Sequence, residues 1–444
     1  MATKTPVASK KSRSAAAWSE RERLVSNGSA AYTNLVLDRA LNAKVWDVDG
    51  KEYIDFAGGI GALNVGHCHP KVVAALREQA GKLLHTSFHV AAYENYMDVC
   101  RELIAVTPGT FMKKAILFNS GSEAIENAVK FARAFTKRKG VISFDNAFHG
   151  RTLLCLTLDG KYKPLRQGFG PCPPEIYHAR FPYAYRAPIG VKPEELTEHC
   201  LEALERFFLV DVAAEDVAAI VVEPVQGEGG FVVPTPGFLK GLRRVCDKHG
   251  ILLIIDEVQT GFGRTGKMFA IEHDGVVPDL MTVGKSLCAG MPLSGVVGRA
   301  EILDAAATGA VGGTYGGNPM SCAAALAVFE IFKDEKLVEA GRRVGAKVEK
   351  RFDALRDRHE FVGDSRGVGA MRALELVTDK RSRTPLPAAR VKEILHDCVD
   401  RGLIVIKAGV HDNVLRTLMP LTIPDADLNR GLDILDEVLG GFKP

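Results

Sequence analysis

The sequence predicts an α/β protein with a large, mostly parallel sheet covered by helices, joined to a smaller α+β domain. Between about residues 115 and 297, short apolar runs alternate with segments of helical periodicity. This alternation is typical of a parallel sheet with helices on both faces. After about Lys333, a long charged helix and shorter strands replace that pattern. The chain has 444 residues, enough for one large and one smaller domain.

The composition indicates an ordinary globular protein and excludes several classes. Hydrophobic residues make up 46% of the chain and charged residues 25%, as in most folded proteins. A net charge of +3 gives no indication of nucleic-acid binding. No apolar run approaches the roughly 20 residues that a membrane-spanning helix needs. Nine scattered cysteines without a C-x-x-C motif indicate reduced thiols, so we expect a cytoplasmic protein.

The N-terminal segment is expected to begin as a tail and then to pack with the small domain. Residues 1–17 are small and basic without an acidic residue, which favours a disordered tail; a targeting segment is the alternative. Residues 18–66 predict a short helix followed by strands, with a hairpin turn at Asp49-Gly50. The glycines within residues 56–66 indicate a loop, or backbone that approaches a ligand closely.

The remaining elements follow from apolar periodicity and from capping or turn residues. We assign residues 67–333 to the large domain, with helices at about 69–84, 93–107, 122–137 and 237–249, and strands at about 115–118, 141–144, 217–222, 251–255, 280–283 and 294–297. We assign residues 334–444 to the small domain, with helices at about 336–359, 388–401 and 426–439, and strands within 363–376 and at 403–406.

Two ionisable residues follow buried strands of the predicted sheet. Asp256 comes directly after the apolar run 251–255, and Lys285 follows the run 280–284. Ligands of α/β sheets bind where the strands end. A desolvated lysine has a lowered pKa and can form a Schiff base, and an acid can pair with a pyridinium nitrogen. The pair therefore suggests pyridoxal phosphate, although a strand-end acid is often a simple ion-pair partner.

Two further stretches offer contacts for a phosphate group. Gly121 and Ser122 begin a helix after a strand, and Ser120 has capping-box spacing to Glu123. Such a helix start binds anions, although a plain helix cap explains it equally well. The glycine-rich turn around Thr314 precedes an alanine-rich helix and offers a second phosphate contact.

Two loops after strands carry aromatic and acidic residues. Phe148 and His149 follow the strand that ends at Phe144, where they are able to stack on a flat ring or to pack within the loop. Glu223 and Glu228 lie on a glycine-rich turn. A solvated loop is one interpretation, but Glu223 directly follows six apolar residues, so we expect it to have a partner.

Two motifs are set aside. Gly261–Gly266 matches G-x-G-x-x-G, but five residues separate it from the strand and no helix follows, so it is not a dinucleotide site; we expect a loop at the mouth of the pocket. His67-Cys68-His69 has no second ligand pair at the spacing of a zinc site, so we expect no metal.

These motifs together resemble the class III aminotransferases, which are pyridoxal-phosphate enzymes of fold type I with a seven-stranded sheet. The resemblance covers about residues 33 to 440 and is greatest to members that act on 4-aminobutyrate. The motifs that carry it are FAGGIGALNVGHCHP, LFNSGSEAIENAVKFARAFT, FHGRTLLCLTLDGK, VEPVQGEGG, LLIIDEVQTGFGRTGKMFA, VGKSLCAGMPLSGVVG and GGTYGGNP.

The resemblance implies a role for each matching residue. Lys285 would form the Schiff base and shuttle protons between substrate and cofactor, and Asp256 would hold the pyridinium proton. Among the other cofactor contacts, Gly121 and Ser122 would bind the phosphate, Phe148 and Val258 would lie on the two ring faces, and Gln259 would reach the ring hydroxyl. Ser120, His149 and Glu223 would lie beside them. Thr314 would complete the neighbouring subunit's phosphate site, which implies a homodimer; a tetramer is the alternative assembly.

The resemblance also implies how two substrates share one site. Arg151 would bind the distal carboxylate of the amino donor, and Ile60 would line the pocket. Arg416 would bind the α-carboxylate of glutamate, and Glu228 would pair with Arg416 while 4-aminobutyrate is bound. An unpaired buried guanidinium is costly, and a carboxylate from glutamate can replace the internal partner.

The chain departs from the family pattern at three positions. Ser122 stands where the family often has alanine, Phe148 where many members have tyrosine, and Arg372 where we expect a smaller or apolar residue near the small-domain side of the pocket.

We therefore expect a ping-pong ω-aminotransferase with 4-aminobutyrate as donor and 2-oxoglutarate as acceptor. 5-Aminovalerate or another ω-amino acid, including an ornithine-type donor, is the alternative substrate. A racemase or epimerase of the same family is the alternative reaction, because it would use the same lysine and aspartate. A ligand-sensing regulator would need a DNA-binding domain, for which residues 1–40 are too short.

Overall fold

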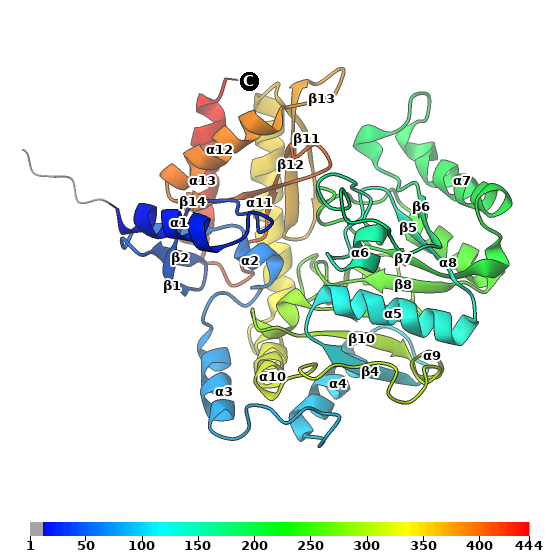
Figure 1. Cartoon of the computed structure of the whole chain (residues 1–444). Coiled ribbons are helices and arrows are strands. Elements are labelled where there is room, and N and C mark those ends of the chain that lie inside the picture. The colour runs from blue at the N-terminus through cyan, green and yellow to red at the C-terminus, as the bar shows by residue number, and fades with distance from the viewer. Residues whose placement is uncertain (1–11, 444) are drawn as a thin grey trace, which may run out of the picture.

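The computed structural model describes residues 12–443, and a seven-stranded sheet forms its larger part (Figure 1). The strand order is β4-β10-β9-β8-β7-β5-β6, and β10 alone runs against the others. The strands are β4 (Lys113–Phe118), β5 (Gly140–Phe144), β6 (Ile176–Ala179), β7 (Val217–Val222), β8 (Leu252–Asp256), β9 (Leu280–Val283) and β10 (Ser294–Arg299). The mostly parallel sheet and the predicted fold class are confirmed.

Helices cover both faces of this sheet because its strands are apolar on both sides. One face packs against α5 (Gly121–Thr136), α6 (Leu153–Leu158) and α9 (Ala300–Leu303). The other face packs against α4 (Glu94–Val106), α7 (Leu196–Val210), α8 (Phe238–His249) and α10 (Pro319–Asp334), and α3 (Pro70–Ala80) packs on α10. Short helical turns lie in the connections: α2 (Gly58–Gly61), η1 (Ala184–Arg186), η2 (Pro193–Glu195), η3 (Ala214–Asp216), η4 (Ala270–His273) and η5 (Lys285–Cys288).

The long helix α11 (Leu337–Arg358) connects the large sheet to the C-terminal part of the chain (Figure 1). Its first residue, Leu337, belongs to the core of the large sheet, whereas Val344, Val348 and Phe352 belong to a second core. That second core includes α12 (Ala388–Asp400), α13 (Asp425–Gly441) and one face of an antiparallel sheet. The strand order of this sheet is β11 (Val362–Val368), β12 (Met371–Asp379), β16 (Val414–Thr417) and β15 (Ile406–Ala408), and β13 (Thr384–Pro385) pairs with β12.

The two ends of the chain meet in a third sheet. The N-terminal strands β1 (Leu37–Leu41), β2 (Lys44–Asp47) and β3 (Glu52–Asp55) form an antiparallel meander. β14 (Leu403–Ile404) then pairs in parallel with β3. The hairpin predicted at Asp49-Gly50 joins β2 to β3. The domain boundaries near residues 66 and 333 stay predictions.

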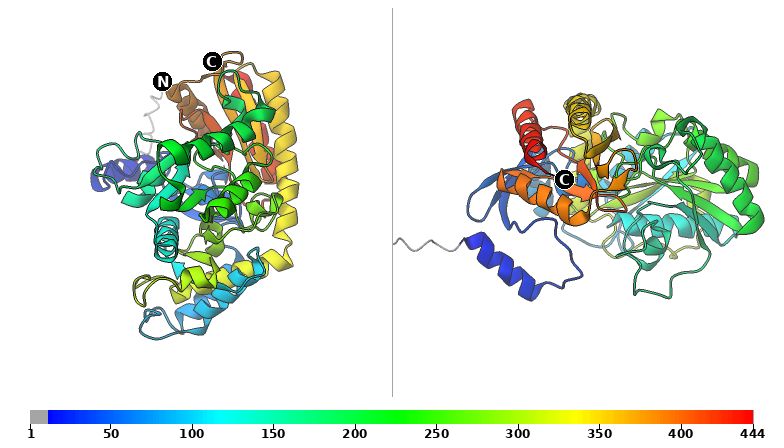
Figure 2. Two further views of the ribbon diagram at one scale, coloured as in Figure 1. Left: turned by 90° about the vertical axis from the view of Figure 1, so that its right-hand side faces the viewer. Right: turned by 90° about the horizontal axis from the view of Figure 1, so that it is seen from above.

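Helix α1 (Arg13–Leu24) corrects part of the predicted tail. Residues 1–11 lie outside the described residues, but residues 13–17 are helical. Ser12 caps the helix by accepting from the amide of Ala15, and the carboxylate of Asp49 accepts hydrogen bonds from the amides of Arg13 and Ser14. These acceptors satisfy amides that would otherwise lack partners at a helix start. None of its residues is buried, and α1 projects from the side of the molecule (Figure 2).

The strand directions place the candidate residues at one edge of the large sheet. Six strands end at the same edge, because only β10 is reversed. Asp256 ends β8, Glu223 follows β7, Lys285 follows β9, and α5 begins three residues after β4. Within residues 12–443, we find no helix that combines the length and the apolar character needed to cross a membrane.

Candidate active site

A cavity of about 320 Å³ lies at this edge and brings most of the predicted residues together. The predicted residues that line it are Ser120, Gly121, Ser122, Phe148, His149, Arg151, Glu223, Glu228, Asp256, Val258, Gln259 and Lys285. It is also lined by residues that were not predicted: Ala62, Asn119, Gly150, Gly290, Met291, Pro292 and Leu293. Asn119, Gly150 and residues 290–293 lie within the same motifs as predicted residues, which is the signal that could have identified them.

Asp256 is fixed at the end of β8 by three hydrogen bonds. Its Oδ1 accepts from the amide of Val258 at 3.0 Å and from the hydroxyl of Thr282 at 3.1 Å. Its Oδ2 lies 2.8 Å from Nδ1 of the buried His149. Burial alone would lower the pKa of His149, but the hydrogen bond and the charge of Asp256 outweigh burial and raise it. The strand end therefore presents a carboxylate whose position and orientation are set by its neighbours.

Lys285 begins the turn η5 directly after β9 and its partly exposed side chain lines the cavity. Its backbone φ is 45°, a left-handed conformation that is uncommon outside glycine and typical of functional sites. Burial lowers the pKa of Lys285, while the nearby carboxylates Glu228 and Asp256 act in the opposite direction. An amine with a lowered pKa is more readily neutral, as a nucleophile or a base must be.

The start of α5 forms the predicted capping box. The amide of Glu123 donates to the Ser120 hydroxyl, and the Glu123 carboxylate accepts from the amide of Ser120 at 2.9 Å. Gly121 allows a close approach here, because a Cβ at this position would lie 3.0 Å from Cγ1 of Val258. The geometry leaves a helix start facing the cavity, where its dipole and free N–H groups favour an anion.

Glu223 connects two loops of the site and is not solvated. One carboxylate oxygen accepts from the amide of Phe148 at 2.9 Å, and the other accepts from the amide of Gly227 at 2.8 Å. Burial raises the pKa of Glu223 to about 7. The expected partner of Glu223 is therefore backbone, and the carboxyl ties the Phe148 loop to the turn that carries Glu228.

Arg416 and Glu228 form an ion pair beside the cavity. Nη2 of Arg416 lies 2.7 Å from Oε1 and 2.8 Å from Oε2 of Glu228. Burial alone would raise the pKa of Glu228, but Arg416 and then Lys285 hold it below its ordinary value. Arg416 contributes to the site through Glu228 and does not line the cavity itself.

A second guanidinium, that of Arg151, lies in the cavity wall. It stands 5.4 Å from the centre of the Phe148 ring, and the Arg151 amide donates to the Ser122 hydroxyl at 3.2 Å. Tyr32 was not predicted as a site residue, yet it lies near both guanidinium groups. Burial and the charge of Glu228 raise the pKa of Tyr32, whereas Arg416 and Arg151 act to lower it. Only its place before the first strand could have suggested it.

Besides Arg416, two predicted residues lie outside the cavity of the single chain. Ile60 is 37% exposed, and its φ of 59° turns the chain within α2. Thr314 is exposed in the turn before α10. Their expected roles, in the pocket and in the neighbouring subunit, stay predictions.

Two other expectations about the surroundings are wrong. The Gly261–Gly266 loop is not at the pocket mouth, since Arg264 is fully buried and donates to the carbonyls of Met419 and Leu418, at 2.8 and 3.2 Å. Arg372 does not disturb the pocket, because its guanidinium pairs with Glu349 at 2.7 Å.

Comparison with known proteins agrees with this geometry. Residues 25–439 match the family model described as aminotransferase class-III. A 5-aminovalerate aminotransferase of Pseudomonas aeruginosa is 49% identical, over 94% of this chain and 96% of its own. A 4-aminobutyrate aminotransferase of Escherichia coli is 48% identical, over 95% of this chain and 97% of its own. An amine transaminase from an uncultivated Pseudomonas species, solved in its pyridoxal-phosphate-bound form, superposes with a TM-score of 0.86 at 31% identity, over 94% of this chain and 97% of its own. The chain belongs to the class III aminotransferase family.

Proposed function

We propose that the protein transfers the amino group of 4-aminobutyrate to 2-oxoglutarate, giving succinate semialdehyde and glutamate by a ping-pong mechanism that depends on pyridoxal phosphate. The observation that carries this proposal is the ion pair between the buried Arg416 and the partly exposed Glu228, beside a cavity that also contains Lys285 and Arg151. The name of the Escherichia coli relative supports this donor. The name of the Pseudomonas aeruginosa relative supports 5-aminovalerate as the second candidate.

The cavity fits pyridoxal phosphate. Among the residues that the structure describes, Nε2 of His149 and Oε1 of Gln259 are buried without a hydrogen-bond partner, and both residues line the cavity. Such groups are costly unless a ligand satisfies them. When bound, pyridoxal phosphate supplies an electron-withdrawing ring that acidifies the substrate C–H bond. The residues that would hold it are Ser120, Gly121, Ser122, Phe148, His149, Glu223, Asp256, Val258, Gln259 and Lys285.

Lys285 is proposed to move the protons of the reaction. Its lowered pKa increases the fraction of neutral amine at ordinary pH, and a neutral amine is able to act as a general base. Nζ of Lys285 takes the proton from the amino-bearing carbon of the donor. In the second half-reaction, it returns a proton to the corresponding carbon of glutamate. Asp256 is held at the strand end by its hydrogen bond to His149.

Two guanidinium groups are proposed to sort the substrates. Arg151 binds the distal carboxylate that 4-aminobutyrate and glutamate share. Arg416 meets the second carboxylate, which only glutamate has. While 4-aminobutyrate is bound, Glu228 neutralises Arg416, so no buried charge is left without a partner. When glutamate binds, its α-carboxylate replaces Glu228 in a bidentate pair.

We also propose that the enzyme is a homodimer located in the cytoplasm. Thr314 is exposed on a turn at the surface of the single chain, where it is accessible to a second subunit. Within residues 12–443, all nine cysteines are free thiols, as is usual in a reducing compartment.

The experiment that tests the proposal is a donor profile. The purified holoenzyme is given 2-oxoglutarate and, one at a time, β-alanine, 4-aminobutyrate, 5-aminovalerate and L-ornithine, and glutamate formation is measured. We expect the largest kcat/KM for 4-aminobutyrate. A largest value for 5-aminovalerate would shift the donor to the second candidate. If no donor gives glutamate and an L-amino acid loses its chirality in the absence of an acceptor, the reaction is an isomerisation and not an amino transfer.

A further inference from the structure

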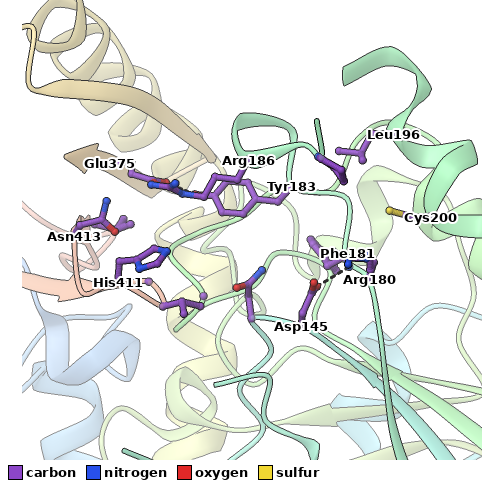
Figure 3. A pocket seen from close by; sticks show the side chains of 16 residues that line it. Asp145, Arg180, Phe181, Tyr183, Arg186, Leu196, Cys200, Glu375, His411 and Asn413 are labelled. Carbon is purple, nitrogen blue, oxygen red and sulfur yellow. Dashed lines mark hydrogen bonds and ion pairs between the residues drawn. The ribbon is translucent and has the colours of Figure 1, made fainter. Parts of the chain in front are cut away.

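The turn that carries Glu228 has little side-chain packing of its own. Residues 227, 229 and 230 are glycines, so three of the four residues at the tip present only backbone. A cavity of about 190 Å³ lies against this turn, and Gly229 and Gly409 are part of its wall. Figure 3 shows the cavity, with His411 and Asn413 among the side chains that line it. The three glycines are buried and have no side chains to interlock with their neighbours, so hydrogen bonds to the backbone of the turn help to fix the position of Glu228.

Two hydrogen bonds from the C-terminal part of the chain fix the tip of the turn. The amide of Gly409 donates to the carbonyl of Glu228 at 2.9 Å. Nε of Arg366, on β11, donates to the carbonyl of Gly230 at 2.8 Å. The ends of the turn are closed separately, since Gln226 and Val232 form an antiparallel bridge. Arg366 lies on β11 and Gly409 directly follows β15, so both contacts come from the C-terminal part of the chain. A longer third contact, of 3.4 Å, runs from Nη1 of Arg416 to the carbonyl of Gly227.

Arg366 has a rigid position because a charged cluster surrounds its guanidinium. Nη1 of Arg366 lies 2.8 Å from the carboxylate of Asp364 and 2.7 Å from that of Glu375. Glu375 also accepts from Nε of Arg186 at 2.6 Å and from the hydroxyl of Tyr183 (Figure 3). The Arg366 side chain is 10% exposed and that of Glu375 is 1% exposed. Two cations and two anions balance, and the planar guanidinium is held in one orientation.

We infer that Arg366 is a positioning residue of the substrate switch: it anchors Gly230 so that Glu228 lies where it can pair with Arg416. This inference rests on the proposed function. The two half-reactions should depend on this anchor to different extents. The half-reaction with 4-aminobutyrate needs Glu228 in place, whereas glutamate brings its own carboxylate to Arg416. Loss of the anchor therefore weakens the first half-reaction more than the second.

The kinetic test compares Arg366→Lys with the matched control Arg372→Lys. Lysine keeps the positive charge but cannot donate to Gly230 and to the carboxylates in the fixed geometry of arginine. Arg372 lies on the neighbouring strand, is 12% exposed, pairs with Glu349 and donates to the carbonyl of Gly369. For Arg366→Lys, we expect kcat/KM of the 4-aminobutyrate half-reaction to fall about tenfold and that of glutamate to fall less than about threefold. For the control Arg372→Lys, we expect kcat/KM of each half-reaction to change by less than about threefold.

A second readout does not depend on activity. Hydrogen–deuterium exchange of residues 226–232 is measured in the cofactor-free protein, with thermal unfolding to verify the fold. We expect faster exchange in Arg366→Lys and wild-type exchange in Arg372→Lys. If Arg366→Lys does not fold, Arg366→Gln is measured in its place, because the shorter amide side chain cannot reproduce the donor geometry of the guanidinium at Gly230.

The outcomes separate the two proposals. Equal losses in both half-reactions, or unchanged exchange of residues 226–232, overturn the role of Arg366. A wild-type protein that makes no glutamate from 4-aminobutyrate overturns the proposed donor. In that case, faster exchange restricted to Arg366→Lys still supports the anchoring of the turn.

Discussion

Nη2 of Arg416 lies 2.7 Å from Oε1 of Glu228, and the Arg416 side chain has no exposed surface. A buried ion pair is weak evidence for stability, because desolvating two charges offsets most of their attraction. Beside a cavity that contains a lysine, the pair is better explained as part of substrate recognition. In the proposed function, Glu228 would neutralise Arg416 while a substrate with one carboxylate is bound, and Arg416 would pair with the second carboxylate of a substrate that has two.

Glu228→Gln is therefore expected to affect the two substrates differently. The amide cannot neutralise Arg416, so the 4-aminobutyrate half-reaction meets an unpaired buried charge. We expect its kcat/KM to fall by about 10- to 100-fold, which corresponds to about 1.4–3 kcal/mol. The glutamate half-reaction should change by less than about threefold. Single-turnover kinetics of each half-reaction measures this, and equal losses would rule out the switch.

Arg151→Met tests the recognition of the distal carboxylate. Both 4-aminobutyrate and glutamate should lose at least about 2 kcal/mol of binding, or roughly 30-fold in kcat/KM, because each loses a charged partner. n-Butylamine has no carboxylate and serves as the matched substrate, so its slow turnover should not fall. If all three substrates were affected alike, Arg151 would support the fold of the loop and not the recognition of the carboxylate.

His149→Asn tests whether His149 holds Asp256 for the cofactor. The variant removes the imidazole that lies 2.8 Å from Asp256, and with it one of the three contacts that orient this carboxylate. We expect the affinity for pyridoxal phosphate, measured by equilibrium dialysis, to fall about tenfold. Asn95→Ala, which lies outside the cavity, serves as a control for a general loss of stability of the fold. Unchanged affinity in His149→Asn would show that the hydrogen bonds from Val258 and Thr282 are sufficient.

Glu257 is expected to make stability fall as pH rises. The side chain is fully buried, and burial raises its pKa from 4.5 to about 7 although Ala270 and Ile271 donate amides to it. Since the folded pKa lies above the unfolded one, the stabilisation is complete below the unfolded pKa and is lost as pH rises through about 7. The full effect is about 3 kcal/mol.

Thermal unfolding between about pH 5 and about pH 8 measures this linkage. We expect Glu257→Gln to flatten the decline of the midpoint, since the amide does not ionise. Glu360→Gln, whose parent side chain is 92% exposed, should leave the decline as in the wild type. Parallel curves for wild type and Glu257→Gln would show that Glu257 is ionised in the folded protein across this range.

The large sheet and the centre of the site were predictable because local patterns specify them. Apolar runs identify the buried strands, and the acid and the amine that follow two of them must lie at the same edge. The capping box at Ser120 and Glu123 is likewise local in sequence, and the structure contains it. The roles proposed for Arg151 and Arg416 rest on the family resemblance. Nothing in the spacing shows that Arg416 pairs with Glu228, 188 positions away.

Other features could not be predicted, because distant contacts determine them. The helix at residues 13–17 depends on acceptors from Asp49. The burial of Arg264 depends on carbonyls more than 150 positions along the chain. Arg366 looks like an ordinary strand residue until β11 is placed beside Gly230. No element is predicted above between residues 145 and 216, where the structure contains α6, β6 and α7.

Transfer of the amino group from 4-aminobutyrate to 2-oxoglutarate can be followed through the nitrogen atom itself. Purified holoenzyme is incubated with ¹⁵N-labelled 4-aminobutyrate and unlabelled 2-oxoglutarate, and mass spectrometry measures the label in glutamate. We predict that glutamate acquires the label in step with the formation of succinate semialdehyde, and that Lys285→Ala forms neither product. Unlabelled glutamate, no glutamate, or labelled glutamate from Lys285→Ala would contradict the account.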